Sequence, residues 1–207
     1  MKGLKALFRS QLRGLLSTGV WVFAAGINAA QAVTPSEAFL ALREVEDDFV
    51  NTGTICEHVA KLELQKEFDP KKYDTWIGIS YSVGQEVIGE LDAVVLDRAS
   101  RKVVLIGEVK CWRNLEAGLE KAHSQEERFR SAVRGEYPYE GQIEFFKMQP
   151  GSDPIAFDSW AFDRDVEYIS IGQKGAVAAG YDRELEMGLE DLMQVRKQIL
   201  SIKRRGN

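Results

Sequence analysis

Three segments in the middle of the chain are expected to be β-strands: hydrophobic and polar residues alternate over 76–83, and short apolar runs dominate 88–97 and 102–111. Alternation predicts a strand, because successive side chains of a strand point to opposite faces of a sheet, and a short apolar run is typical of a buried strand. Only a short polar turn separates the second segment from the third, which is typical of antiparallel neighbours. We therefore expect the three strands to form an antiparallel meander.

Apolar residues recur at helical spacing on both sides of this meander. Helices are expected over 36–50 and 54–67 before it, and over 113–134 and 183–202 after it. The first helix is preceded by Val33-Thr34-Pro35-Ser36-Glu37, and a hydroxyl residue, a proline and an acid in this order are typical of a helix start.

Between the last two helices, the pattern predicts a short strand at 143–148, a loop-rich segment at 149–165 and another strand at 166–171. This later strand follows the helix at 113–134, as in a crossover connection. The predicted order is therefore helix, antiparallel meander, helix and strand. We expect an α/β fold with a mixed central sheet, flanking helices and a C-terminal helix.

The composition is that of a soluble globular protein and supports a single domain over 33–207. The chain has 207 residues, of which 44% are hydrophobic and 29% are charged, and this length is sufficient for a hydrophobic core. No stretch of the sequence is long and apolar enough to be a convincing membrane helix.

The first 32 residues are similar to a secretory signal peptide. An apolar stretch at 15–25 is followed by small residues at a cleavage site, Ala30-Gln31-Ala32. We therefore expect a periplasmic or secreted protein. The alternatives are an amphipathic helix or an organellar presequence, and the protein would be cytoplasmic if this segment is not a signal. The charges that precede Glu37 are all basic: Lys2, Lys5, Arg9 and Arg13.

The chain is acidic, with a net charge of −5. Removal of residues 1–32 would leave 23 Lys and Arg against 32 Asp and Glu, a net charge of −9. Affinity for DNA depends largely on neutralisation of its phosphates, so this charge counts against a tight nucleic-acid binder. It does not exclude an enzyme whose metal ions screen its carboxylates.

Three charged residues interrupt the apolar strands. Glu108 and Lys110 are two positions apart and point to the same face, and Asp92 lies on the neighbouring strand. Charged groups on a hydrophobic hairpin are costly unless they are paired or hold a metal. These residues are therefore the strongest candidates for a functional site.

The sequence around them resembles the PD-(D/E)xK nuclease superfamily, which has a restriction-endonuclease-like fold. The resemblance covers roughly residues 53–130 and rests on two motifs, Gly89-Glu90-Leu91-Asp92-Ala93-Val94-Val95 and Ile106-Gly107-Glu108-Val109-Lys110. It implies a core of helix, antiparallel meander, helix and strand, with one acid on the second strand and the E-x-K triplet on the third.

The resemblance also implies a catalytic site that uses Mg²⁺ or Mn²⁺. The expected ligands are Asp92, Glu108 and the Val109 backbone carbonyl, because Mg²⁺ prefers hard oxygen atoms. Glu57 on the preceding helix is expected to complete the site, and Glu63 is the alternative. Lys110 is expected to position the attacking water or to stabilise developing negative charge.

A further resemblance concerns the helix after the meander. Gln125 begins Gln125-Glu126-Glu127-Arg128-Phe129, which is similar to the Q-x-x-x-Y element of RecB-like members, although Phe129 replaces the tyrosine. It implies an auxiliary role for Gln125. The alternative is a solvated glutamine on a helix face.

The cysteines and tryptophans each allow two interpretations. Cys56 and Cys111 could pair in an oxidising compartment. We favour two small buried hydrophobic residues, because Cys111 is expected to point away from Lys110 and Cys56 is adjacent to Glu57. The tryptophans could stack on bases, although packing in the core or at its edge is the commoner use: Trp76, Trp112 and Trp160.

Together, these features predict an exported metal-dependent nuclease that hydrolyses phosphodiester bonds, with DNA a better expected substrate than RNA. The intact set of Asp92, Glu108 and Lys110 favours the enzyme. The acidic charge favours the alternative, a non-catalytic partner-binding or immunity-like protein on the same fold. A cytosolic restriction or repair enzyme is a third hypothesis, if the N-terminal segment is not a signal.

Overall fold

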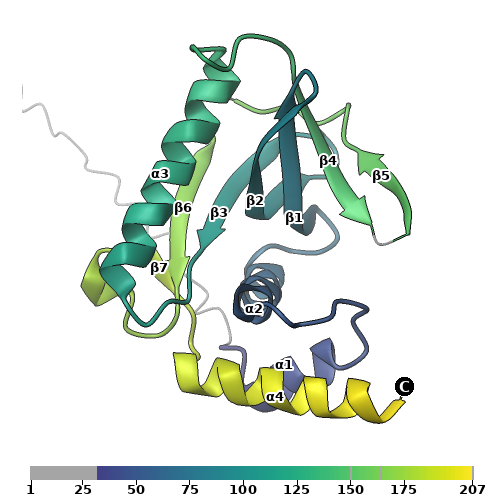
Figure 1. The fold of residues 1–207 in the computed structure, drawn as a ribbon, viewed down its shortest axis with the longest axis vertical. Coiled ribbons are helices and arrows are strands. Elements are labelled where there is room, and N and C mark those ends of the chain that lie inside the picture. Colours follow the sequence, from purple (N-terminus) through teal and green to yellow (C-terminus); the bar gives the residue numbers. More distant parts are fainter. Residues whose placement is uncertain (1–31, 150, 164, 207) are drawn as a thin grey trace, which may run out of the picture.

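The computed structural model describes residues 32–149, 151–163 and 165–206, and within these residues the protein is an α/β structure built around one mixed sheet. The strands are β1 (Tyr73–Val83), β2 (Glu86–Asp97), β3 (Val103–Val109), β4 (Ile143–Gln149), β5 (Ser152–Ala156), β6 (Glu167–Gly172) and β7 (Arg183–Glu184). They are arranged in the order β5-β4-β1-β2-β3-β6-β7 (Figure 1).

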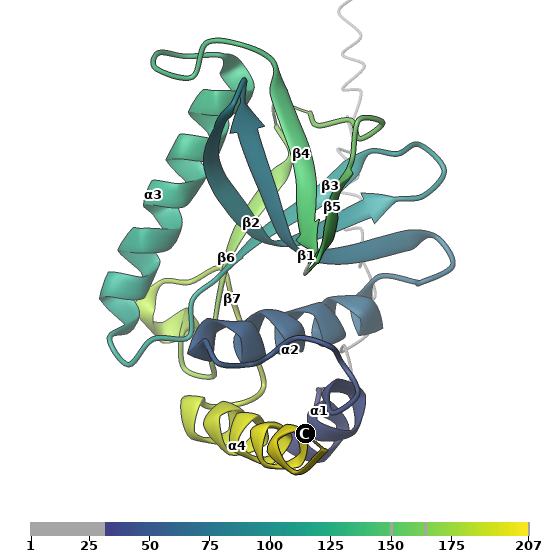
Figure 2. The same ribbon diagram turned by 45° about the vertical axis from the view of Figure 1, so that its right-hand side comes forward.

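The α-helices cover both faces of this sheet (Figures 1 and 2). They are α1 (Pro35–Leu42), α2 (Thr52–Glu67), α3 (Leu115–Arg134) and α4 (Leu189–Gly206). One core cluster joins α1, α2 and α4 to one face, and a second cluster lies between α3 and the other face. None of the helices in the described part of the chain is long and apolar enough to span a membrane.

The predicted meander is confirmed. β1 and β3 both pair with β2 in antiparallel orientation, and Ala93 lies opposite Gly107 in the β2–β3 pair. β6 pairs with β3 in parallel orientation after the chain has passed through α3. The sheet is therefore mixed, as expected from a meander followed by a helical crossover.

The hairpin of β4 and β5 departs from the prediction, because residues 149–165 were expected to be loop-rich. β4 pairs with β1, and β5 forms the outer edge of the sheet. All five residues of Ser152–Ala156 are exposed, so this strand has no buried face and no alternating pattern. Its backbone pairing with β4, rather than hydrophobic burial, places it in the sheet.

Two predicted helices have different bounds. The helix expected over 36–50 ends at Leu42, because Phe49 is buried with a positive φ of 53° and Asp47 bonds to His58 on α2. The helix expected over 183–202 begins only at Leu189, since the preceding chain pairs with β6.

The β1–β2 hairpin is strongly curved (Figure 2). Gly78 on β1 has a φ of 62°, a backbone conformation that favours glycine. Ile77 and Ile79 are two positions apart, but they belong to the core clusters on opposite sides of the sheet. They pair with Ala93 and Leu91, so Asp92 lies at this bend. The bend therefore determines where the Asp92 carboxylate leaves the sheet.

Candidate active site

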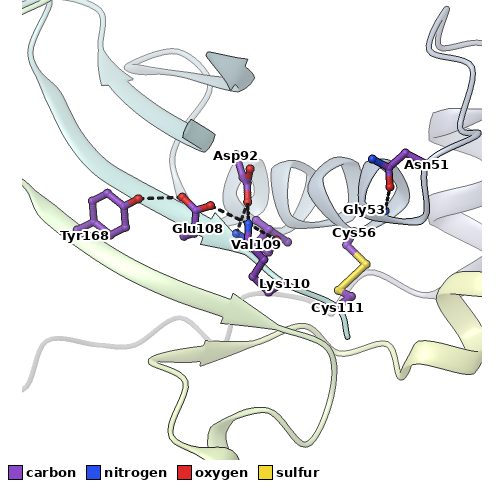
Figure 3. A network of polar contacts seen from close by, with 9 residues as sticks. All are labelled: Asn51, Gly53, Cys56, Asp92, Glu108, Val109, Lys110, Cys111 and Tyr168. Atoms are coloured by element: carbon purple, nitrogen blue, oxygen red, sulfur yellow. Dashed lines mark hydrogen bonds and ion pairs between the residues drawn. A yellow bond between two sulfur atoms is a disulfide. The ribbon is translucent and has the colours of Figure 1, made fainter. Parts of the chain in front are cut away.

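The Lys110 ammonium group lies between two carboxylates (Figure 3). Its Nζ atom donates to Asp92 Oδ2 at 2.6 Å and to Glu108 Oε1 at 2.7 Å. A third contact joins Nζ to the Val109 carbonyl oxygen at 3.2 Å. The predicted residues of the second and third strands therefore meet at one point.

This meeting point forms where β2 and β3 separate. Their described ladder ends at the pair of Ala93 and Gly107, so the Val109 amide lies beyond the paired backbone of β2. It donates instead to Asp92 Oδ2 at 2.8 Å. The carboxylate thus takes the place of a backbone acceptor, and a carboxylate that accepts from an amide and an ammonium is held in a fixed orientation.

Tyr168 on β6 holds the other oxygen of Glu108 and was not identified from the sequence. Its hydroxyl donates to Glu108 Oε2 at 2.8 Å. Phe129 contacts its ring with a centroid distance of 5.8 Å, and the Arg130 guanidinium lies over the same ring. The parallel pairing of β3 and β6 brings this tyrosine to the site, and no local motif marks it.

The charged cluster is deeply buried, since Glu108 is 0% exposed, Asp92 6% and Lys110 9%. Burial, followed by the nearby charge of Asp92, raises the pKa of Glu108 to about 8. Burial opposes the charge of Lys110, but the two carboxylates outweigh it and raise the pKa of the ammonium. One cation thus faces two acids, and the cluster would accommodate further positive charge.

The Glu57 carboxyl group lies close enough to this cluster for the charge of Asp92 to affect its pKa. The residue is half-buried on α2, and its Oε1 atom lies 3.3 Å from the position that a Cβ on Gly53 would take. Burial, followed by the charges of Asp92 and Glu90, raises the pKa of Glu57 to about 8. The alternative residue, Glu63, instead accepts a hydrogen bond from the Glu186 amide. Glu57 is therefore the better candidate on this helix.

The expectation that Cys56 and Cys111 are separate buried residues is wrong, because they form a disulfide with a Cα–Cα distance of 6.3 Å (Figure 3). The prediction assumed that strand alternation continues to residue 111. β3 ends at Val109, so alternation no longer determines the direction of the Cys111 side chain.

The remaining candidates from the sequence are Gln125 and the tryptophans. The Gln125 side-chain oxygen is buried on α3 and has no hydrogen-bond partner in the described residues. Trp76 and Trp160 both pack against Phe157, with centroid distances of 5.1 and 4.1 Å. Trp112 is 44% exposed, so core packing does not account for it.

The oxygen atoms around Lys110 have the chemistry that a hard divalent cation requires. Asp92, Glu108 and the Val109 carbonyl converge there, and Mg²⁺ binds such oxygen ligands while keeping several waters. Over the residues that the structure describes, no group of three or more His, Cys, Asp or Glu side chains is arranged to hold a metal. The two carboxylates and the carbonyl are oxygen donors of the kind that such a cation binds.

The predicted signal peptide over residues 1–32 lies, except for Ala32, outside the described residues.

The chain was compared with protein-family models, curated proteins and solved structures, and none of them matches this chain.

Proposed function

We propose that this protein is a metal-dependent nuclease of the PD-(D/E)xK type, with a restriction-endonuclease-like core. The observation that carries the proposal is the convergence of Asp92 and Glu108 on the Lys110 ammonium where β2 and β3 separate. A buried cluster of two acids and one lysine is expensive to maintain. Its position at a bend of the sheet, beside the partly exposed Glu57, supports a catalytic rather than a purely structural role.

In this proposal, Asp92, Glu108 and the Val109 carbonyl hold Mg²⁺ or Mn²⁺, and Glu57 completes the site. The bound metal would acidify a water molecule and neutralise charge on the scissile phosphate. Lys110 orients the attacking water and donates to the oxygen on which negative charge develops. Tyr168 fixes the orientation of Glu108 through its hydrogen bond.

We further propose that the protein acts outside the cytoplasm, in the periplasm or as a secreted enzyme. The disulfide between Cys56 and Cys111 supports this location, because such bonds persist mainly in oxidising compartments. DNA is the preferred substrate in this proposal. Because the net charge of the chain is negative, a metal ion bound at the site would attract the phosphate groups of the substrate.

A second candidate function is a non-catalytic binding protein on the same fold. The observation that favours it is the complete burial of Glu108, with both of its oxygens already hydrogen-bonded to Lys110 and Tyr168. A cluster of this kind could serve only to fix the positions of β2, β3 and β6. Measurements of nuclease activity and of metal binding distinguish the two candidate functions.

The test is digestion of plasmid DNA, single-stranded DNA and RNA by residues 33–207, with Mg²⁺, Mn²⁺ or EDTA. Asp92→Asn and Glu108→Gln should abolish both metal binding and cleavage. Lys110→Ala should retain metal binding, or improve it, and lose about 10²–10³-fold in rate, equivalent to about 3–4 kcal/mol. Glu86→Gln removes an exposed acid from the same strand as Asp92 and should have no effect.

Folded wild-type protein that is inert on every substrate with both metals would overturn the nuclease proposal in favour of the binding protein. Calorimetric titration with Mn²⁺ provides a readout that does not depend on choosing the right substrate.

A further inference from the structure

A groove of about 1000 Å³ lies directly beyond the end of β3. The loop between β3 and α3 forms one wall, and the chain after β6 and the start of α4 form others. It begins at Cys111, the residue that follows Lys110. We propose that this groove binds a single-stranded segment of nucleic acid, with one base stacked on Trp112. The inference rests on the proposed function for the identity of its ligand.

Trp112 has the properties of a fixed stacking platform. The residue is 44% exposed and lines the groove, while its backbone carbonyl accepts a hydrogen bond from Gln173 Nε2 at 2.8 Å. A Cβ on Gly118 would lie only 3.5 Å from the Trp112 Cβ, so α3 packs closely behind the residue. Bases stack on such exposed aromatic rings with little dependence on sequence.

Two cations line the same groove. Arg113 and Lys174 form no ion pair with any described residue, and Glu190 is the acid that lines the groove with them. Both cations line the same groove as the exposed Trp112. They suit a ligand that combines phosphates with aromatic bases.

Gln173 provides an independent indication of a ligand. Its side chain is 6% exposed and lines the groove, and its Oε1 atom is buried without a hydrogen-bond partner in the described residues. A buried acceptor without a donor is costly. The exocyclic amino group of cytosine, adenine or guanine, or the ring N3–H of thymine or uracil, would supply that donor.

The experiment measures binding without cleavage. Fluorescein-labelled dC₁₂, dT₁₂ and a duplex of equal length are titrated with protein in EDTA and followed by anisotropy. Trp112→Ala should weaken binding of dC₁₂ by about 5- to 150-fold, as expected for the loss of one stacked base, and Trp112→Phe should restore most of it. Tyr137→Ala removes another exposed ring, which is 85% exposed in the loop after α3, and should leave binding unchanged.

The other contacts give separate readouts. Arg113→Ala with Lys174→Ala should weaken binding and reduce its dependence on salt, and dC₁₂ and dT₁₂ should both bind more tightly than the duplex, whose bases are not free to stack on Trp112. Equal losses in Trp112→Ala and Tyr137→Ala, or no loss in either, would overturn the groove proposal even if the protein cleaves DNA. Binding that depends on Trp112 in a protein without cleavage activity would support the groove and count against the nuclease.

Discussion

The disulfide between Cys56 and Cys111 joins the residue before Glu57 to the residue after Lys110 (Figure 3). It therefore fastens α2 to the end of β3 next to the candidate site. The two cysteines are 55 positions apart in sequence. Without the bond, only side-chain packing would keep the Glu57 carboxylate near Asp92.

Reduction of this disulfide should lower the free energy of unfolding by about 2–5 kcal/mol, because the reduced unfolded chain gains conformational freedom. Urea titrations with and without a reducing agent measure the change. Cys56→Ala with Cys111→Ala should reproduce the loss and make the protein insensitive to the agent. At temperatures where the reduced protein is still folded, its affinity for Mn²⁺ should fall, because Glu57 is no longer held in place. Unchanged metal affinity would show that packing alone positions α2.

Tyr168→Phe should weaken metal binding and cleavage by about 10- to 100-fold, as for other residues that orient a metal ligand. It should also lower the free energy of unfolding by about 1–3 kcal/mol, because Glu108 Oε2 loses its buried donor. Manganese titration and urea unfolding measure these two effects. Tyr73→Phe, at the start of β1, is a matched removal of a tyrosine hydroxyl and should show neither.

Glu57→Gln should stabilise the metal-free protein increasingly as the pH rises. The pKa of Glu57 is raised from 4.5 to about 8 in the folded protein, so between these values the native state binds a proton that the unfolded state releases. This part of the stability is present below pH 4.5 and is lost as the pH rises through 8. Urea unfolding in EDTA at pH 5, 7 and 9 should show a growing advantage for the variant. An advantage that shrinks toward pH 9 would contradict the raised pKa.

Gly118→Ala should be destabilising, although alanine favours helices by about 1 kcal/mol over glycine. The new Cβ would lie 2.4 Å from the Tyr181 hydroxyl oxygen and 3.5 Å from the Lys110 Cβ. Thermal unfolding should show a loss of about 1–3 kcal/mol, typical of overpacking. In a Tyr181→Phe background, the same substitution should cost much less, because the clashing oxygen is gone. Equal costs in both backgrounds would locate the strain elsewhere.

Local patterns were sufficient to predict the meander, but not the face of every strand residue, because Ile77 and Ile79 lie on opposite sides of the sheet. Glu108 and Lys110 point to the same side because strand geometry repeats every two residues. Asp92 joins them because β2 and β3 are consecutive and antiparallel. Each of these relationships involves neighbours along the chain or across one short turn, so the sequence alone predicted that the three residues come together. The bend of the sheet, which no local pattern marks, decided where the Asp92 carboxylate points.

Contacts between distant segments were decided only by the tertiary structure. Tyr168 reaches Glu108 because β6 enters the sheet beside β3 in parallel orientation, and alternation within one strand cannot select a neighbour on another. Cys56 and Cys111 pair because β3 ends two residues before the second cysteine and α2 packs nearby. Burial of Phe49 in the core, in turn, ends the first helix early. In each case the free energy comes from packing and hydrogen bonds across the fold, which outweigh the local preferences that a sequence pattern records.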